Sequence, residues 1–331
     1  MTKNSIVSMS QTIDHSCKKI LITTFMAEPI VKVENLSHRY SVQWAIRNID
    51  FEIEKNGIYG LLGSNGAGKS TTMNIMCGVI KPTEGNVFIK GVNLKENPVE
   101  AKRHIGFLPQ QPPLHMDLTV EEYLTHCAHM RHVPVKEIQK ALQKVMGRCK
   151  ITHFKKRLIR NLSGGYQQRV GIAQAIIHEP DFVVLDEPTN GLDPNQIVEV
   201  RHLIKEIAEE RTVVLSTHIL PEVQATCEHI RMIEQGKLVF TGSVKEFDNY
   251  ILPSSIFVSL LEMPAVEELK KIPEILEVEE LGGPNYRLRF ADAFEAREKI
   301  VEMSVAKGWR LNEIYVEKNS MDAIFAELSK K

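Results

Sequence analysis

The sequence predicts an α/β fold followed by a smaller α+β domain, and three observations lead to this prediction. First, the apolar run Ile58–Leu62, the glycine-rich stretch Gly63–Thr71 and the apolar stretch Met73–Cys77 follow in series, which is the strand, turn and helix order of a phosphate-binding loop. Second, the apolar runs Phe182–Asp186 and Thr212–Ser216 each follow a predicted helix, as parallel strands buried on both faces do. Third, the C-terminal end of the chain has a separate pattern of short predicted strands and helices.

With 331 residues, the chain is longer than a typical single domain, so we expect two domains. We place a disordered tail at 1–27, a main domain at 28–245 and a smaller domain at 254–331. The tail is polar, lacks clear periodicity and contains no apolar stretch long enough for a signal-peptide core. Met26 stands just before the first strand pattern, so both Met1 and Met26 remain candidate translation starts.

The main domain is expected to be strand-rich at both ends and to carry a helical insertion at 118–158. Within this insertion the apolar residues change to the helical spacing of three to four. The strands predicted on either side are Ile30–Leu36, Ala45–Ile53, Ile58–Leu62, Asn86–Lys90, Ile105–Pro109, Phe182–Asp186, Thr212–Ser216, Ile230–Ile233 and Leu238–Thr241.

The smaller domain has the element order βαββαβ with a terminal helix, which predicts a ferredoxin-like sandwich. It shows no pair of nucleophile and base and no cluster of metal ligands, so we interpret it as a structural or oligomerisation module. Its predicted elements are Ser255–Leu260, Ala265–Lys271, Leu276–Leu281, Tyr286–Phe290, Ala293–Lys307, Leu311–Val316 and Met321–Leu328.

Composition narrows the class of protein. Hydrophobic residues make up 43% and charged residues 25%, as in ordinary globular proteins, and a formal net charge of −1 gives no electrostatic reason to expect a nucleic-acid partner. The five cysteines are odd in number and lack metal-ligand spacing, which indicates free thiols in a reducing compartment. No apolar run approaches the ~20 residues that span a bilayer, so a membrane role would require a partner.

The glycine-rich stretch predicts a nucleotide site. Its glycines allow several backbone N–H groups to point at one polyphosphate, and the following helix adds its positive end. Lys69 would reach the β- and γ-phosphates, the Ser70 hydroxyl would bind Mg²⁺, and Thr71 would lie near the α-phosphate. The residues predicted to hold the nucleotide here are Gly63, Ser64, Asn65, Gly66, Ala67, Gly68, Lys69, Ser70 and Thr71.

Two carboxylates, Asp186 and Glu187, end the strand at 182–186. A carboxylate at the end of a neighbouring strand can hold Mg²⁺, while the next one contacts water. We therefore assign Asp186 to the metal and Glu187 to the base that activates the water attacking the γ-phosphate.

The stretch Leu162–Arg169, which reads LSGGYQQR, resembles the signature motif of ATP-binding cassette (ABC) ATPases. It lies between the two nucleotide motifs, as it does in that family. The resemblance extends over about residues 28–245, and it implies a P-loop fold of ABC type with a mixed core sheet, a helical insertion and an antiparallel β subdomain. Further positions that match the family are Tyr40 (adenine-stacking aromatic), Gln110 (Q-loop), Asp193 with Gly191 and Leu192 (D-loop) and His218 (switch histidine).

The resemblance implies ATP and Mg²⁺ as cofactors, with Gln110 joining Ser70 and Asp186 at the metal, and with Gln110 and His218 acting beside Glu187. Ser163, Gly164 and Gly165 precede a helical run and could offer a second phosphate-binding surface. In the family this surface closes over ATP bound to another subunit, which implies a head-to-tail dimer with a second copy or a homologous subunit.

Tyr166, the stretch Thr189–Pro194 and the tail Asn319–Leu328 are similar to the exporter-type group that includes drug-resistance and gliding-motility ATPases. This resemblance implies the ATPase subunit of an ABC exporter whose membrane-spanning permease is a separate polypeptide. Such a subunit would be cytoplasmic and peripheral on the inner face of the cell membrane.

Two alternatives remain open. An importer ATPase would use the domain at 254–331 to sense a ligand, and binding of a small metabolite to that domain would favour it. A soluble ABC protein acting on ribosomes or DNA is disfavoured by the single cassette, the absence of a long coiled-coil insertion and the near-zero net charge.

Overall fold

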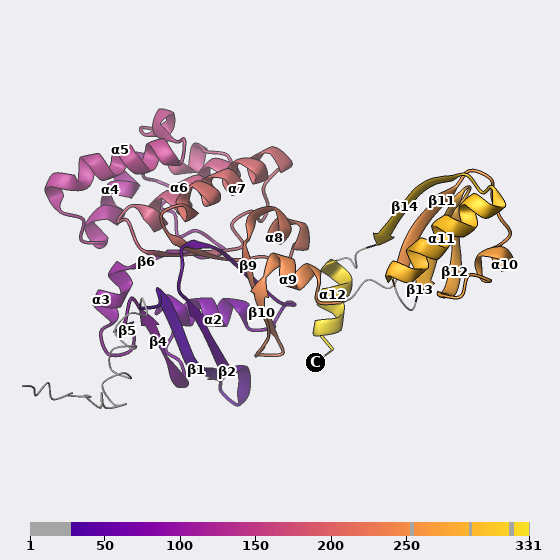
Figure 1. The fold of residues 1–331 in the computed structure, drawn as a ribbon. Coiled ribbons are helices and arrows are strands. Elements are labelled where there is room, and N and C mark those ends of the chain that lie inside the picture. Colours follow the sequence, from indigo (N-terminus) through magenta and orange to yellow (C-terminus); the bar gives the residue numbers. More distant parts are fainter. Residues whose placement is uncertain (1–27, 252–254, 291–292, 318–320, 331) are drawn as a thin grey trace, which may run out of the picture.

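Three β-sheets organise the described part of the chain, which comprises residues 28–251, 255–290, 293–317 and 321–330 of a computed structural model (Figure 1). The predicted tail at 1–27 lies outside these residues. No helix in the described ranges combines the length and apolarity needed to cross a membrane.

The central sheet has six strands in the order β10-β9-β3-β8-β7-β6, parallel except for the pair β9 and β10. All residues of β3, β7 and β8 are buried, as expected for strands covered on both faces. The strands are β3 (Gly57–Leu62), β6 (Ile105–Leu108), β7 (Phe182–Asp186), β8 (Thr212–Ser216), β9 (His229–Glu234) and β10 (Lys237–Ser243).

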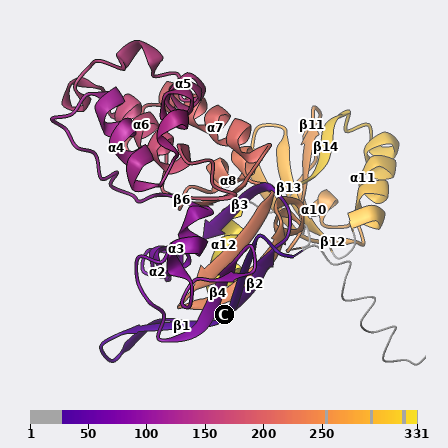
Figure 2. The same ribbon diagram turned by 90° about the vertical axis from the view of Figure 1, so that its left-hand side faces the viewer.

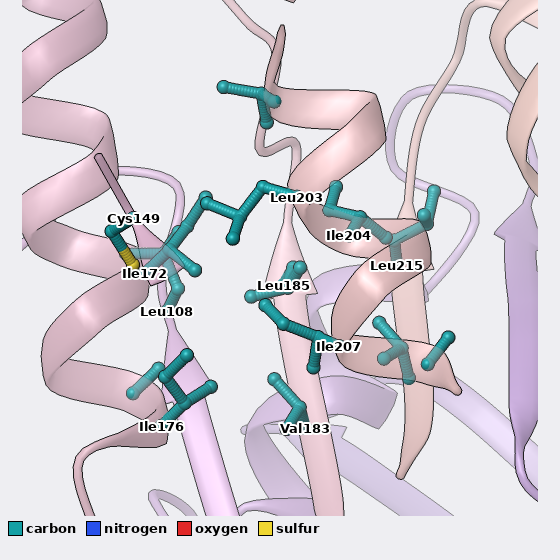
Figure 3. Close-up of a cluster of buried hydrophobic side chains, with 14 of the residues drawn as sticks. Leu108, Cys149, Ile172, Ile176, Val183, Leu185, Leu203, Ile204, Ile207 and Leu215 are labelled. Atoms are coloured by element: carbon teal, nitrogen blue, oxygen red, sulfur yellow. The ribbon is translucent and has the colours of Figure 1, made fainter. Parts of the chain in front are cut away.

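One face of this sheet is covered by helices α6 and α7, as Figure 3 shows for the side chains between them and strands β6, β7 and β8. Val183 and Leu185 of β7 point to this face, whereas Val184 points to the opposite one. The helices of this layer are α4 (Val120–Met130), α5 (Ile138–Arg148), α6 (Gly164–Ile176), α7 (Pro194–Ala208) and α8 (Leu220–Thr226).

The other face packs on α2 (Lys69–Met76) and on a four-stranded antiparallel sheet (Figure 2). Its order is β2-β1-β4-β5, and a short helix α3 (Pro98–Arg103) follows it. The mixed central sheet, the antiparallel sheet and the helical insertion confirm the predicted fold class. The antiparallel strands are β1 (Val31–Tyr40), β2 (Gln43–Ile53), β4 (Glu84–Ile89) and β5 (Val92–Asn93).

The first and last residues of the helical insertion lie next to each other, as a hydrogen bond of 3.0 Å from the Ile159 N–H to the Leu118 carbonyl shows. Its first helix, α4, begins with a capping box in which Thr119 and Glu122 satisfy each other's backbone N–H groups. The apolar positions that predicted helices are buried there: Val120, Tyr123, Leu124, Ile138, Leu142 and Val145.

The C-terminal sheet has the order β12-β13-β11-β14 and is antiparallel, which is the order of a ferredoxin-like sandwich. Its buried side chains form a core separate from those of the other sheets. The elements are β11 (Ser255–Leu260), α10 (Val266–Leu269), β12 (Ile275–Gly282), β13 (Asn285–Phe290), α11 (Ala293–Lys307) and β14 (Leu311–Glu317).

The last helix, α12 (Met321–Leu328), lies against the main domain. The sequence assigns this helix to the second domain, but it packs beside α9 (Val244–Asp248), and its buried residues Ile324 and Leu328 join the core that contains Phe247 (Figure 1). Periodicity identifies the apolar face of a helix but does not identify the surface that covers it. The ferredoxin-like unit is therefore attached to the main domain at both of its ends.

Candidate nucleotide site

The predicted phosphate-binding loop connects β3 to α2. At two positions of this loop a side chain larger than that of glycine would not fit. A Cβ on Gly63 would lie 2.1 Å from the Ile233 carbonyl oxygen, and one on Gly68 would lie 2.5 Å from the Ile46 side chain. Both have positive φ, at 154° and 110°. Gly66 also has positive φ, and a Cβ there would meet open space, so this part of the loop faces outward.

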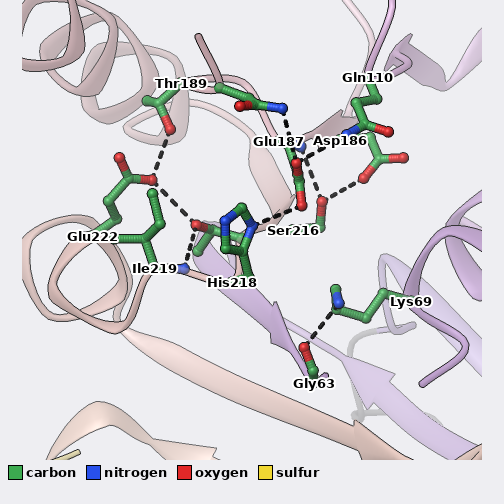
Figure 4. A network of polar contacts seen from close by, with 12 residues as sticks. Gly63, Lys69, Gln110, Asp186, Glu187, Thr189, Ser216, His218, Ile219 and Glu222 are labelled. Atoms are coloured by element: carbon green, nitrogen blue, oxygen red, sulfur yellow. Dashed lines mark hydrogen bonds and ion pairs between the residues drawn. The ribbon is translucent and has the colours of Figure 1, made fainter. Parts of the chain in front are cut away.

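Lys69 lies inside this loop and is 7% exposed. Its Nζ donates to the Gly63 carbonyl oxygen at 2.8 Å (Figure 4). It also donates to the Ser64 carbonyl oxygen at 2.9 Å. Burial lowers the pKa of Lys69, and the nearby carboxylates of Glu187 and Asp186 oppose that shift. The ammonium group is thus held at the start of α2, where phosphates would also meet the positive end of the helix.

Glu234, at the end of β9, fixes the loop from the other side. Its carboxylate accepts hydrogen bonds from the Ser64 backbone N–H at 3.1 Å and from the Ser64 hydroxyl at 2.6 Å. Glu234 was not predicted from the sequence. An acidic residue after the strand pattern at 230–233 was a possible signal, but it lies 170 positions from Ser64.

The two predicted carboxylates follow β7, next to β8. The Ser216 hydroxyl donates to Asp186, and the Ser216 oxygen accepts from the Glu187 N–H at 3.0 Å. Ser216 pairs with Asp186 in the register of the two strands, and no role was predicted for it from the sequence. Glu187 has a φ of 47°, a left-handed conformation that is uncommon for a residue other than glycine.

Glu187 is the centre of the polar network in Figure 4. Its Oε1 lies 2.9 Å from Nδ1 of His218, and its Oε2 accepts from the side-chain amides of Gln110 at 3.0 Å and Asn190 at 3.2 Å. Gln110, Glu187 and His218 lie beyond the carboxyl ends of β6, β7 and β8, which are neighbours in the sheet. Parallel strands bring their carboxyl ends to one edge, and three predicted residues therefore meet there. Asn190 was not predicted.

The remaining predicted residues lie elsewhere. Tyr40, at the end of the β1–β2 hairpin, is 53% exposed and has its ring against His38. Asp193 is the N-cap of α7 and accepts from the Gln196 N–H, a structural role that was not predicted from the sequence.

The signature residues begin α6. Ser163 is its N-cap but makes no side-chain hydrogen bond to the helix, and both Ser163 and Gly164 are exposed. Gly165 is buried against Gln196, where a Cβ would lie 2.5 Å from the amide carbon. Helix α6 and helix α2, which carries Lys69, lie on opposite faces of the central sheet (Figure 1).

This loop, with the paired carboxylates and polar residues at the adjacent strand ends, defines the class of P-loop nucleotide hydrolases. The family model for ABC transporters matches residues 46–190. The bacitracin transport ATP-binding protein BcrA of Bacillus licheniformis is 39% identical over 212 residues, which cover 63% of this chain and 68% of that protein. The chain belongs to the ABC transporter family as an ATP-binding and ATP-hydrolysing subunit.

Two further comparisons extend this finding. The linearmycin resistance ATP-binding protein LnrL of Bacillus subtilis is 27% identical over 307 residues, covering 91% of this chain and 98% of the relative. The dimeric structure of the ABC transporter cassette MJ0796 superimposes with a TM-score of 0.59 at 27% identity, covering 65% of this chain and 98% of the cassette. The same cassette is known in a dimeric post-hydrolysis state bound to ADP and Pi.

Proposed function

We propose that this chain binds MgATP at the loop Gly63–Thr71 and hydrolyses it with Glu187 as the base. The observation that carries this proposal is the placement of the Glu187 carboxylate between His218 on one side and Gln110 and Asn190 on the other. A carboxylate accepts but does not donate, so Nδ1 of His218 carries the proton in this contact. The four groups come from three strand ends and a turn, which holds the base in a single orientation.

The residues assigned to Mg²⁺ suit that ion. Ser70, Asp186 and Gln110 offer hydroxyl, carboxylate and amide oxygens, the hard donors that Mg²⁺ prefers. Asp186 is held in place by the Ser216 hydroxyl. When bound, Mg²⁺ would supply positive charge that offsets the negative charge of the phosphates. Tyr40 would stack on the adenine, and Asp193 would lie near the nucleotide of the closed dimer.

The signature residues Ser163, Gly164 and Gly165 act on ATP bound to a second copy. The placement of α6 and α2 on opposite sheet faces supports this assignment, as does the dimeric state of the similar cassette MJ0796. The unused N-cap hydroxyl of Ser163 is available to a phosphate from another chain.

Mixing two variants tests this sharing. Lys69→Ala loses a phosphate ligand but keeps its signature. Gly164→Asp keeps its loop but places a carboxylate where phosphate would approach, and a Cβ on Gly164 meets nothing within 4 Å, so the fold tolerates it. Each variant alone should hydrolyse little ATP. An equal mixture should recover up to about a quarter of wild-type turnover, because half of the dimers then hold one intact composite site of two. A mixture no more active than its components would contradict shared sites.

We further propose that the subunit drives a permease of separate chains as an exporter, from the inner face of the cell membrane. BcrA and LnrL, named for bacitracin transport and linearmycin resistance, support the direction. The helical insertion would contact the permease, because it is attached to the segment after Gln110: the Tyr123 hydroxyl donates to the Pro113 carbonyl at 3.2 Å. Co-purification of the chain with membrane proteins encoded beside it would test this assignment.

A further inference from the structure

The carboxylate of Glu222 connects two loops of the nucleotide site (Figure 4). Its Oε2 accepts hydrogen bonds from the Thr189 hydroxyl at 2.7 Å and from the Thr217 hydroxyl at 3.2 Å. Thr189 lies two positions after Glu187, and Thr217 immediately precedes His218. One oxygen atom therefore joins the loop that follows β7 to the loop that follows β8.

This junction is shielded from water. Glu222 is 4% exposed, and both threonines are also buried. Hydrogen bonds to a buried carboxylate are stronger than those to a neutral acceptor, and losing one leaves a buried polar group without a partner. The other carboxylate oxygen lies 3.5 Å from the Arg201 guanidinium of α7. The two loops are thus held to each other and to α7 through one side chain.

Each loop is also stiffened internally. The Asn190 N–H donates to the Glu187 carbonyl at 3.1 Å, so Thr189 lies within a closed turn that begins at the proposed base. On the other side, the Thr217 oxygen accepts from the Ile219 N–H at 3.0 Å, across the residue His218. The 2.9 Å contact between Glu187 and His218 therefore joins two turns that each contain an internal hydrogen bond, and Glu222 connects the same two turns.

We propose that Glu222 is a positioning residue for ATP hydrolysis. It sets the distance between Glu187 and His218 and passes displacements of the turn at 190–193 on to His218. Asn190, Gly191 and Asp193 are exposed, so a second copy can contact that turn directly. The inference rests on the proposed roles of Glu187 and His218, and Glu222 acts only through them.

The test measures kcat and KM for ATP in the full-length protein. Thr189→Val and Thr217→Val remove one hydroxyl each and keep the side-chain shape, whereas Glu222→Ala removes the acceptor. Each should lower kcat by about tenfold, with KM changed much less, because a charge-assisted hydrogen bond is lost away from the nucleotide. Glu222→Gln should recover most of the rate, since its amide oxygen can still accept both hydroxyls.

Ile204→Ala is the matched control, because Ile204 lies buried on α7 outside this junction. It should lower the melting temperature without lowering kcat at 25 °C. If the threonine variants keep wild-type kcat while Glu187→Gln is inactive, the role of Glu222 is wrong and the proposed base stands. If Glu187→Gln keeps full turnover, the proposed base fails and this inference fails with it.

Discussion

Replacing Glu187 by glutamine should abolish turnover while leaving the fold and MgATP binding intact. The glutamine fits the network in one orientation. Its amide oxygen can accept from Gln110 and Asn190, as Oε2 does now, and its NH₂ group then points to Nδ1 of His218. That orientation requires His218 to carry its proton on Nε2 instead, which a neutral imidazole can do. The variant therefore keeps a hydrogen-bond partner for the side chains of Gln110, Asn190 and His218.

The chemical step, in contrast, loses its base. General-base catalysis typically contributes about 10²- to 10⁴-fold, which corresponds to roughly 3–5 kcal/mol of activation free energy. Single-turnover hydrolysis at saturating MgATP should fall by that factor. The dimer with bound ATP should accumulate, and size measurement with and without MgATP would detect it.

Glu228→Gln provides the control, because it also removes one carboxylate. Glu228 is exposed and lies just before β9, beside Gly57, at the amino ends of the strands and thus away from Glu187. It should retain wild-type turnover. If the single-turnover rate of Glu187→Gln stays within about threefold of the wild-type rate, Glu187 is not the base, because removing a general base lowers the rate by more than that.

Three other outcomes are expected. Tyr123→Phe should leave basal ATPase unchanged but weaken its stimulation by the proposed permease, because the hydrogen bond that joins the insertion to Pro113 is lost. ATPase rates with and without membranes containing the permease would measure this, and equal stimulation would contradict it. Ile324→Ala should lower the free energy of unfolding by about 2–5 kcal/mol in denaturant titrations, because this side chain of α12 is fully buried; a loss of a few tenths would mean that α12 is not docked. Burial lowers the pKa of His178 from 6.5 to about 4, so the folded state binds fewer protons, and stability is lost as pH falls from about 6.5 towards 4. The full shift corresponds to on the order of 3 kcal/mol, and His178→Gln should remove that part of the pH dependence.

The nucleotide loop and the central strands could be predicted because their signals are local. The apolar run at 58–62, the glycines after it and Lys69 are adjacent in sequence. This pattern of residues is compatible with few structures other than a strand, a glycine turn and a helix in series. Parallel strands buried on both faces also have a distinctive composition, which identified the strand ending at Asp186. The family resemblance added Gln110 and His218, which lack a local signal of their own.

The sequence by itself thus determined the fold class and the family, and it supplied the residues that are proposed to meet the phosphates. Only the tertiary structure decided how these residues are held: Glu234 contacts Ser64 across 170 positions, and Glu222 contacts Thr189 across 33. It also decided that α12 returns to the main domain. The physical reason is the same in each case: a buried acidic side chain or an apolar helix face needs a partner, but only folding in three dimensions selects which residue becomes that partner.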